Sequence, residues 1–544
     1  MALDRLCRKA YFDVSMQMHA IYPSMRQVMI GQRGAVATSQ PQAALAGMEM
    51  LLAGGNAADA AIAMAAALAV LEPTSNGLGS DAFALVWDGS DLKGLNASGK
   101  SPSILDTSLI FGQPALPELG WLPVTVPGAI SGWMDLWRRY GKMPFGELLA
   151  PAIRYAEEGF ALTPGIARDW ARSAARFQDL PHALRASFFD CFFPQGFKPK
   201  AGAIYRNPPQ ARTLREIAQT EGKSFYQGAL AQKTASFARK TGGFLSFEDL
   251  TAHEPLWVEP LSIPYGEYTV YELPPNGQGL AALLALGILS GLGVSRHPRE
   301  SSQSYHLQIE AMKLALADAR AYICDPQILP IKPERFLDLA YLADRRACIG
   351  DRAMTLANPG HPRGGTVYLA AADGNLMVSF IQSNYQGFGS GVVIPGTGIA
   401  LQNRGACFSL DPCHPNAAAP GKRPFHTIIP GFLARNGKPL GPFGVMGGPM
   451  QPQGHLQVIV NMADYGMNPQ AALDAPRWRF LEGSRVLLES SVPRHVALDL
   501  ADMGHEVEMS PEASDFGRGQ IILQEEGVFF AGSEPRADGM ALTW

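Results

Sequence analysis

Strand-like segments are concentrated in the last third of the chain, and this distribution most constrains the fold. TVYLAAA and LMVSFIQ flank Asp373-Gly374-Asn375, the strongest β-hairpin signal in the sequence. Further strand candidates follow as VLLES, HEVEM and QIILQ. Helical patterns dominate the first two thirds. This order predicts a layered α+β arrangement and argues against a regular βαβ repeat.

Three segments are predicted to be helices. The first covers about 41–53, and the second begins after Asn56, a good N-cap residue, and ends before Pro73. The third covers 304–323, where apolar residues recur at helical spacing. Weaker helical patterns lie between 128 and 160.

Composition and charge exclude several classes of function. The 544 residues include 17% charged and 47% hydrophobic residues, which indicates a large interior, and a net charge of -4 argues against a nucleic-acid partner. The most apolar run, at 57–71, is too short to span a membrane, and the N-terminus lacks an uninterrupted apolar signal core. We therefore expect a cytoplasmic protein with no membrane partner. The six cysteines show no paired spacing, so we expect no disulfide.

Common catalytic and cofactor motifs are missing from the sequence. It contains no G-x-x-x-x-G-K-[ST], no G-x-G-x-x-G before a helix, no H-E-x-x-H and no G-x-S-x-G. Cys407, Cys413 and His414 match no regular zinc spacing, and core thiols with a loop histidine are the better interpretation. The sequence therefore predicts no cofactor and no metal.

A threonine at the head of the hairpin is the main candidate for chemistry. A two-residue turn at Asp373-Gly374 would place Thr366 opposite Ile381, with the amides of Gln382 and Asn384 beside the hydroxyl. Threonine is also a favoured strand residue, and on spacing alone this structural interpretation is preferred. A catalytic role for Thr366 needs further support.

That support comes from ordered segments along nearly the whole chain, from about residue 30 to the end. They include GGNAADAAIAMAAALAVLEPTSNGLGSDAFALVW (54–87), VPGAISGWMDLWRRYGKMPFGELLAPAIRYAEEGF (126–160), LPPNGQG (273–279), HLQIEAMKLALADARAYICDP (306–326), GFGSGVVIPGTGIALQNR (387–404), PGKRPFHTIIP (420–430) and VMGGPMQPQGHLQVIVNMADYGMNPQAALDAPRW (445–478). Together these segments resemble the gamma-glutamyltranspeptidase family, which comprises gamma-glutamyltransferases and glutathione hydrolases.

The resemblance implies an N-terminal-nucleophile hydrolase with a four-layer αββα sandwich. Such a protein is made as a precursor and cuts itself before a threonine, here between Gly365 and Thr366. It implies an N-terminal extension (1–29), a large subunit (30–365) and a small subunit (366–544) that form one interleaved domain. The product would be a heterodimer of self-cleaved subunits, with further oligomerisation left open.

The resemblance implies that one residue, Thr366, supplies both the nucleophile and the general base. The freed α-amine of Thr366 has a reference pKa of about 7.7 to 8.0, so it can take the proton of the hydroxyl during attack on an amide. The acyl-enzyme would be released by water or by an amine acceptor. The Gly447-Gly448 pair matches the family's oxyanion-hole glycines, and Asn384 is retained near the nucleophile. The expected partner is a small-molecule amide.

The residues that would bind the substrate depart from the family pattern. Lys100, or Ser98, stands near the position of the family's carboxylate-binding arginine. Arg404 replaces a glutamine and Cys407 replaces the acidic partner of the substrate ammonium. His426 and Thr427 replace a serine pair that binds the carboxylate, and Gln382 completes the set of candidate binding residues.

These departures leave three interpretations. The protein is a gamma-glutamyl hydrolase or transferase with altered contacts; or it is an acylase for dicarboxylic (glutaryl-type) amides, in the manner of the glutaryl-cephalosporin acylases that resemble this family; or it stays uncut and only binds a small molecule. An arginine at position 404 should repel a substrate ammonium, so the local charge favours an anionic acyl tail without one.

Overall fold

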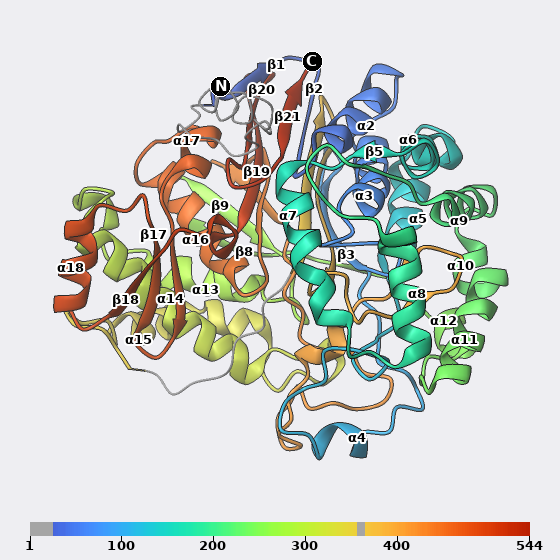
Figure 1. Ribbon diagram of the computed structural model, residues 1–544. Helices are drawn as coiled ribbons and strands as arrows, with labels where there is room; N and C mark the ends of the chain where they lie inside the picture. The colour runs from blue at the N-terminus through green and yellow to red at the C-terminus, as the bar shows by residue number, and fades with distance from the viewer. Residues whose placement is uncertain (1–25, 356–364) are drawn as a thin grey trace, which may run out of the picture.

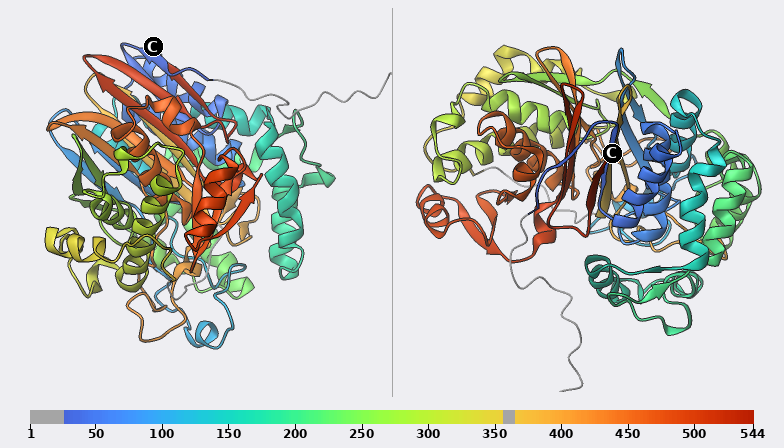
Figure 2. Two further views of the ribbon diagram at one scale, coloured as in Figure 1. Left: turned by 90° about the vertical axis from the view of Figure 1, so that its left-hand side faces the viewer. Right: turned by 90° about the horizontal axis from the view of Figure 1, so that it is seen from above.

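The computed structural model describes residues 26–355 and 365–544 (Figure 1). Two seven-stranded sheets lie face to face, and helices cover the outer face of each sheet (Figure 2). The layers follow the order helix, sheet, sheet, helix. The α+β class and the αββα sandwich expected from the sequence are therefore confirmed.

The first sheet has the strand order β21-β2-β10-β11-β3-β4-β7, and each neighbouring pair is antiparallel. Its strands are β21 (Met540–Thr543), β2 (Gly34–Thr38), β10 (Gly365–Asp373), β11 (Met377–Tyr385), β3 (Asp81–Trp87), β4 (Leu92–Asn96) and β7 (Leu256–Val258).

The second sheet has the order β1-β20-β19-β15-β14-β9-β8. Its strands are β1 (Met29–Gly31), β20 (Val528–Ser533), β19 (Arg518–Glu525), β15 (Lys438–Met446), β14 (Gly431–Arg435), β9 (Tyr268–Glu272) and β8 (Leu261–Tyr265). Three small sheets complete the strands of the described residues. One pairs β5 (Phe160–Ala161) with β6 (Ile204–Tyr205), and one pairs β12 (Val393–Ile394) with β13 (Ile399–Ala400). The third contains β16 (Trp478–Glu482), β17 (Arg485–Glu489) and β18 (Glu506–Ser510).

Each sheet has its own helical layer. The first sheet is covered by α2 (Pro41–Leu52), α3 (Ala57–Leu71), α5 (Ala129–Tyr140) and α6 (Phe145–Glu158), with α7 (Pro164–Ser173), α8 (His182–Phe192), α9 (Pro208–Gln219), α10 (Lys223–Gln227), α11 (Ala229–Thr241) and α12 (Phe247–Thr251) packed further out (Figure 1). The second sheet is covered by α13 (Gly279–Leu289), α14 (Ser302–Tyr322), α15 (Leu339–Arg346), α16 (Met450–Ala463), α17 (Pro469–Asp474) and α18 (Arg494–Asp502).

Helix α3 shows how local sequence determines an element. The Asn56 side chain accepts hydrogen bonds from the N–H groups of Ala58 and Asp59, and the Asp59 carboxylate accepts one from Asn56 N, which forms a capping box. Every residue of α3 is buried, because the helix lies between β10 and β11 on one side and the outer helices on the other. The apolar run at 57–71 is therefore a core helix.

The predicted helices are confirmed, with small shifts at their ends. The segments expected at 41–53, after Asn56 and at 304–323 correspond to α2, α3 and α14. No helix among the described residues is both long enough and apolar enough to cross a membrane.

The register of the central hairpin differs from the prediction. Ala372 pairs with Met377, and Tyr368, not Thr366, lies opposite Ile381. The reason is the side chain of Asp373, whose Oδ1 accepts hydrogen bonds from the N–H groups at 375 and 376, so the two-residue turn lies at 374–375, one residue further along the chain, and each partner on β11 shifts by two. The pairing is also interrupted by a bulge between Gly365 and Val367.

Below the sandwich, two long connections lie together around 97–125 and 405–425 (Figure 1). The first contains the short helix α4 (Ser108–Phe111), and Leu105, Ile110, Phe408 and Ala418 form a small separate hydrophobic cluster between them. This pair of connections lies beside the cavity described below.

Candidate active site

Thr366 lies on the central strand β10 and is fully buried. Its Oγ1 lies 3.0 Å from Oγ of Ser383 on the neighbouring strand β11, and Ser383 Oγ also accepts a hydrogen bond from Tyr385 N at 2.7 Å. Tyr385, the last residue of β11, has a φ of 73°, which lies outside the range of a β-strand, so the backbone changes direction here. Sequence reasoning missed Ser383, because the predicted register placed Ile381 in its position.

The structure does not bring the Gln382 amide to the Thr366 hydroxyl. Neighbouring residues of a strand point to opposite faces, and Gln382 points to the outer helices. Its Nε2 donates to the backbone oxygen of Ala65 at 2.8 Å and to Asn76 Oδ1 at 2.6 Å, and its Oε1 accepts from Trp133 Nε1 at 3.0 Å. Gln382 therefore joins the sheet to α3 and α5, and the prediction that it lies beside Thr366 is wrong.

Asn384 is held at the end of β11. Its Oδ1 accepts a hydrogen bond from Ser80 Oγ at 2.8 Å. Its buried Nδ2 makes no hydrogen bond with any residue that the structure describes. A buried amide donor of this kind is free to bind a substrate or reaction oxygen.

Arg404 opens a short 3-10 helix (Arg404–Cys407) and is completely buried. Its Nη1 donates to Thr427 Oγ1 at 2.7 Å and approaches Cys407 Sγ at 3.8 Å. The guanidinium carbon lies 4.5 Å from the centre of the Tyr385 ring. Nε and Nη2 make no hydrogen bond within the described part of the chain.

Asp81, at the start of β3, supplies the acidic group beside Arg404. Its Oδ2 lies 3.9 Å from Arg404 Nε and 3.0 Å from His426 Nε2. Because His426 Nδ1 accepts from Ile428 N at 3.4 Å, Nε2 carries the proton and donates to Asp81. Burial lowers the pKa of His426 well below its usual range, so the imidazole is neutral. Burial also raises the pKa of Asp81 to about 7, and the charge of Arg404 opposes that rise.

Asp81 was not among the site residues predicted from the sequence, although the sequence contains one feature that points to it. Asp81 is the charged residue at the head of the otherwise apolar strand DAFALVW, and its side chain is completely buried. A buried carboxylate needs a partner. Its partners His426 and Arg404 are more than three hundred residues away along the chain.

A cavity of about 600 Å³ lies directly against this cluster. Tyr385, Cys407 and Thr427, which all contact Arg404, are part of its wall. Much of the remaining wall is apolar and includes Leu116, Leu316, Ala319, Ile323, Phe408, Leu410 and Phe425. The cavity therefore combines a largely apolar wall with residues that contact the cation Arg404.

The glycine pair lies at the turn between β15 and α16. Gly447 and Gly448 have φ values of 137° and 60°, which glycine adopts without strain. Gln278 fixes the turn, because its Nε2 donates to the backbone oxygens of Gly448 at 2.9 Å and Thr427 at 2.6 Å. The N–H groups of both glycines make no hydrogen bond with the described residues. The next residue, Pro449, lines the cavity.

Lys100 is not part of the Arg404 cluster. Its backbone oxygen accepts from Val126 N at 2.9 Å, and its side chain makes no hydrogen bond or ion pair with the residues described. Ser98 Oγ donates to Asn96 Oδ1 at 2.7 Å. The second cation near Asp81 is Arg423, whose Nε donates to the backbone oxygen of Ser98 at 3.0 Å.

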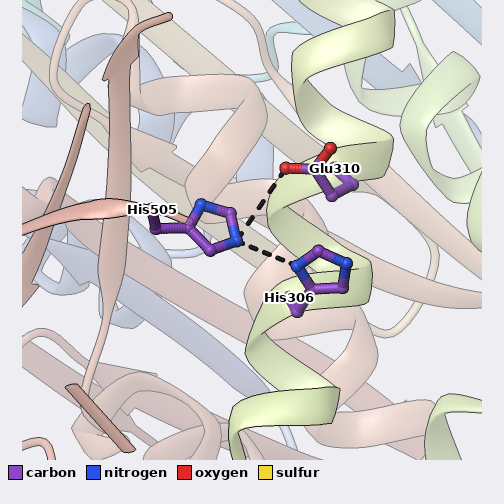
Figure 3. A group of neighbouring side chains, drawn as sticks. All are labelled: His306, Glu310 and His505. Atoms are coloured by element: carbon purple, nitrogen blue, oxygen red, sulfur yellow. Dashed lines mark hydrogen bonds and ion pairs between the residues drawn. The ribbon is translucent and has the colours of Figure 1, made fainter. Parts of the chain in front are cut away.

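A second polar cluster lies away from the cavity, in the layer that contains α14. His306 and Glu310 lie one turn apart on α14, and His505 approaches from the loop before β18 (Figure 3). His306 Nδ1 lies 2.9 Å from His505 Nε2, which lies 3.9 Å from Glu310 Oε1. These residue types could hold a metal ion. However, Lys313 Nζ lies 2.6 Å from Glu310 Oε1, so an ammonium group already supplies the positive charge.

This cluster instead holds the segment at 350–354. His306 Nε2 donates to the backbone oxygen of Gly350 at 2.8 Å. Glu310 Oε2 accepts from Met354 N at 3.0 Å, and Lys313 donates to Met354 O at 3.0 Å. The cluster therefore fixes the last described residues before the strand that carries Thr366.

Comparison with known proteins agrees with this architecture. Residues 43–544 match the family model described as gamma-glutamyltranspeptidase. The chain is 36% identical to the glutathione hydrolase-like YwrD proenzyme of Bacillus subtilis, over 95% of this chain and 100% of that protein. It is 34% identical to the oxamate amidohydrolase proenzyme of Klebsiella pneumoniae, over 95% of this chain and 99% of that protein.

A solved structure extends the similarity to the whole fold. The crystal structure of cephalosporin acylase from Bacillus halodurans is 51% identical, with a TM-score of 0.94 over 98% of this chain and 99% of that chain. The match in sequence and structure runs along nearly the entire chain. The protein therefore belongs to the gamma-glutamyltranspeptidase family.

Proposed function

We infer that the protein cuts itself before Thr366 and then hydrolyses amides whose acyl group ends in a carboxylate. The observation that carries this inference is the burial of Arg404 together with its donors that lack hydrogen-bond partners. Its guanidinium is completely buried behind the cavity wall, and its Nε and Nη2 have no hydrogen-bond partner among the described residues. Two unpaired donors on a buried cation match the two oxygens of a carboxylate.

Self-cleavage would begin at the Thr366 hydroxyl. Its Oγ1 attacks the carbonyl carbon of Gly365, the peptide C–N bond breaks, and the released α-amine takes the hydroxyl proton. Water then hydrolyses the ester and leaves Thr366 as the first residue of the small subunit. Ser383 Oγ, at 3.0 Å from Oγ1, is placed to orient the hydroxyl in this step.

Substrate hydrolysis would repeat this chemistry on an external amide. The α-amine of Thr366 accepts the hydroxyl proton while Oγ1 forms a bond to the amide carbon, and the proton then passes to the departing amine as the C–N bond breaks. The unpaired N–H groups of Gly447 and Gly448 are candidates to stabilise the oxyanion. Water releases the acid and restores the enzyme.

The charge around Arg404 supports a dicarboxylic acyl group over a gamma-glutamyl group. A gamma-glutamyl group also carries an α-ammonium, which would lie close to the guanidinium and be repelled. The acid beside Arg404, Asp81, already accepts a hydrogen bond from His426. The relatives named as an oxamate amidohydrolase and a cephalosporin acylase are also amide hydrolases, and oxamate carries a carboxylate next to its amide.

The test compares two amides that differ only in the α-amino group: glutaryl 4-nitroanilide and gamma-glutamyl 4-nitroanilide. We expect a kcat/KM about tenfold or more higher for the glutaryl compound, because one like-charge contact is avoided. Higher activity on the gamma-glutamyl compound would contradict the acylase assignment and restore the gamma-glutamyl one.

Intact mass under denaturing conditions tests the nucleophile. Two fragments that meet between Gly365 and Thr366, together with a single uncut chain in Thr366→Ala, are expected. A single chain in both proteins would contradict self-cleavage and favour the interpretation as a binding protein.

A further inference from the structure

Arg320 is a charged residue on one wall of the cavity, and no carboxylate in the described part of the chain lies within ion-pair distance of it. The last turns of α14 place Leu316, Ala319 and Arg320 on the same side of the helix, and all three line the cavity. The Arg320 guanidinium makes no hydrogen bond and no ion pair with the residues that the structure describes. Burial lowers its pKa, which reflects an incompletely compensated charge.

The acids near Arg320 are engaged elsewhere. Glu482, the acid whose charge acts most on Arg320, forms an ion pair with Arg485 at 3.0 Å. Glu118, which also lines the cavity, pairs with Arg176 at 3.0 Å and accepts from Gln386 Nε2 at 2.9 Å. The cavity therefore has an excess of positive charge at Arg320.

Arg320 and Arg404 are separate positions on the cavity. His414 Nε2 donates to the backbone oxygen of Arg320 at 3.0 Å, and His414 Nδ1 accepts from Asn416 N at 3.0 Å. Asn416 Nδ2 then donates to the backbone oxygen of Cys407 at 2.7 Å, and Cys407 contacts Arg404. This series of contacts links the backbone of Arg320 on α14 to the backbone of Cys407 in the 3-10 helix of Arg404, so the two arginines belong to different elements around the cavity.

We propose that Arg320 binds an acidic group on the amine half of the substrate, so that the preferred substrate is an amide with a carboxylate on each side of the scissile bond. This inference rests on the proposed function, in which Arg404 binds the acyl carboxylate. The apolar residues of the cavity wall would contact the carbon skeleton of the amine. The products are a dicarboxylic acid and an amino acid or aminoaryl acid.

Two glutaryl anilides test the proposal: N-glutaryl aniline and N-glutaryl-3-aminobenzoate, which differ only in the carboxylate on the amine. The wild-type enzyme should prefer the aminobenzoate by about 10- to 100-fold in kcat/KM, mainly through KM, because one charge-assisted hydrogen bond is added. Arg320→Met should reduce this preference to about threefold or less and leave the rate on glutaryl aniline unchanged.

Controls separate a specific effect from a general one. Arg335 is an exposed arginine that does not line the cavity, and Arg335→Met should keep the wild-type preference. Equal preferences in the wild-type and Arg320→Met enzymes would overturn the proposal. An equal loss on both anilides would also overturn it, because Arg320 would then serve the acyl half or the fold.

Binding of the product amines tests the role of Arg320 independently of turnover. Calorimetric titration of the self-cleaved wild-type protein with 3-aminobenzoate and with aniline should give a Kd about tenfold or more lower for the acid, and Arg320→Met should lose that difference. If neither anilide is hydrolysed, the proposed function fails, while this binding difference would still support the role of Arg320. Equal affinities for both amines would overturn it.

Discussion

The charge on Asp81 is expected to control how strongly Arg404 binds an anionic acyl group. Asp81 Oδ2 lies 3.9 Å from Arg404 Nε, and burial raises the pKa of Asp81 to about 7, while the charges of Arg404 and Arg423 oppose that rise. The other contacts of this carboxylate are neutral, namely the imidazole of His426 and the backbone N–H of Gly99, which donates to Oδ1 at 3.4 Å. Below this pKa the substrate meets a cation alone, and above it Asp81 and the substrate compete for the same guanidinium.

The expected effect follows from Coulomb's law. A substrate carboxylate bound to Nε and Nη2 would lie within about 7 Å of Asp81, where two negative charges repel by ~2 kcal/mol at an effective dielectric constant of about 20. This energy corresponds to a factor of about 30 in affinity. The wild-type KM for a glutaryl anilide should therefore rise about 15-fold between about pH 6 and about pH 8.5, on the way to the limit of about 30-fold, because the bound substrate raises the pKa of Asp81 in turn; Asp81→Asn should remove most of that rise.

The assay measures kcat and KM separately for both proteins across this pH range. At about pH 6 the two KM values should agree within about threefold, because wild-type Asp81 is then mostly protonated. The rise of kcat with pH should persist in Asp81→Asn, since it reports the α-amine of Thr366, whose reference pKa is about 8. A ratio of wild-type to variant KM that is the same at both ends of the range would refute the reasoning.

Four further predictions concern stability and catalysis. Burial raises the pKa of Asp81 to about 7, above the value of about 3.9 that is usual for an aspartate. The wild-type protein should therefore lose up to ~4 kcal/mol of unfolding free energy as pH rises between these values, and Asp81→Asn should not, as pH-dependent urea unfolding would show; parallel curves would contradict this. Ser383→Ala should slow self-cleavage by about 10- to 100-fold on denaturing gels, and an unchanged time course would exclude a role for Ser383 in orienting Thr366. Gly447→Ala should lower kcat about 100-fold or more, since φ is 137° and an added Cβ would lie 3.1 Å from Gly517 Cα; wild-type kcat would argue against an oxyanion role. Lys313→Met should destabilise the fold by about 3 kcal/mol in urea, because Glu310 loses its ammonium partner at 2.6 Å, and Glu310→Gln added to it should recover part of the loss; no recovery would mean that packing, not charge, is responsible.

Local chemistry explains which parts of the fold were predictable. Asn56 caps α3 through its own side chain, and the apolar run that follows can only be a buried helix of that length, so both its position and its burial could be inferred. The hairpin could be located but its register could not. Asp373 fits either a turn position or the residue before the turn, and its bond from Ala57 N at 2.8 Å, which comes from a distant helix, favours the second.

In the candidate site, too, some residues could be predicted from the sequence and others could not. Thr366, Arg404 and the glycine pair could be proposed from the sequence because family resemblance supplied their positions. The contacts of Asp81 could not be proposed, since His426 lies 345 residues away along the chain and only tertiary packing brings the two together. Lys100 was proposed because it stands near the position of the family's carboxylate-binding arginine, and the structure places its side chain outside the cluster around Arg404.

The strand order of the two sheets has a consequence for the life of the mature enzyme. In the first sheet, β10 and β11 follow the proposed cleavage position but lie between β2 and β3, which precede it. In the second sheet, β1 and β9 precede it but pair with β20 and β14. After cleavage, the two polypeptides would share every main-chain hydrogen bond across these seams, so dilution should not separate them. Once heat has separated them, however, refolding becomes a bimolecular reaction between incomplete sheets with exposed edges. The precursor should therefore recover after unfolding more readily than the mature enzyme, whose lifetime is set by its rate of unfolding.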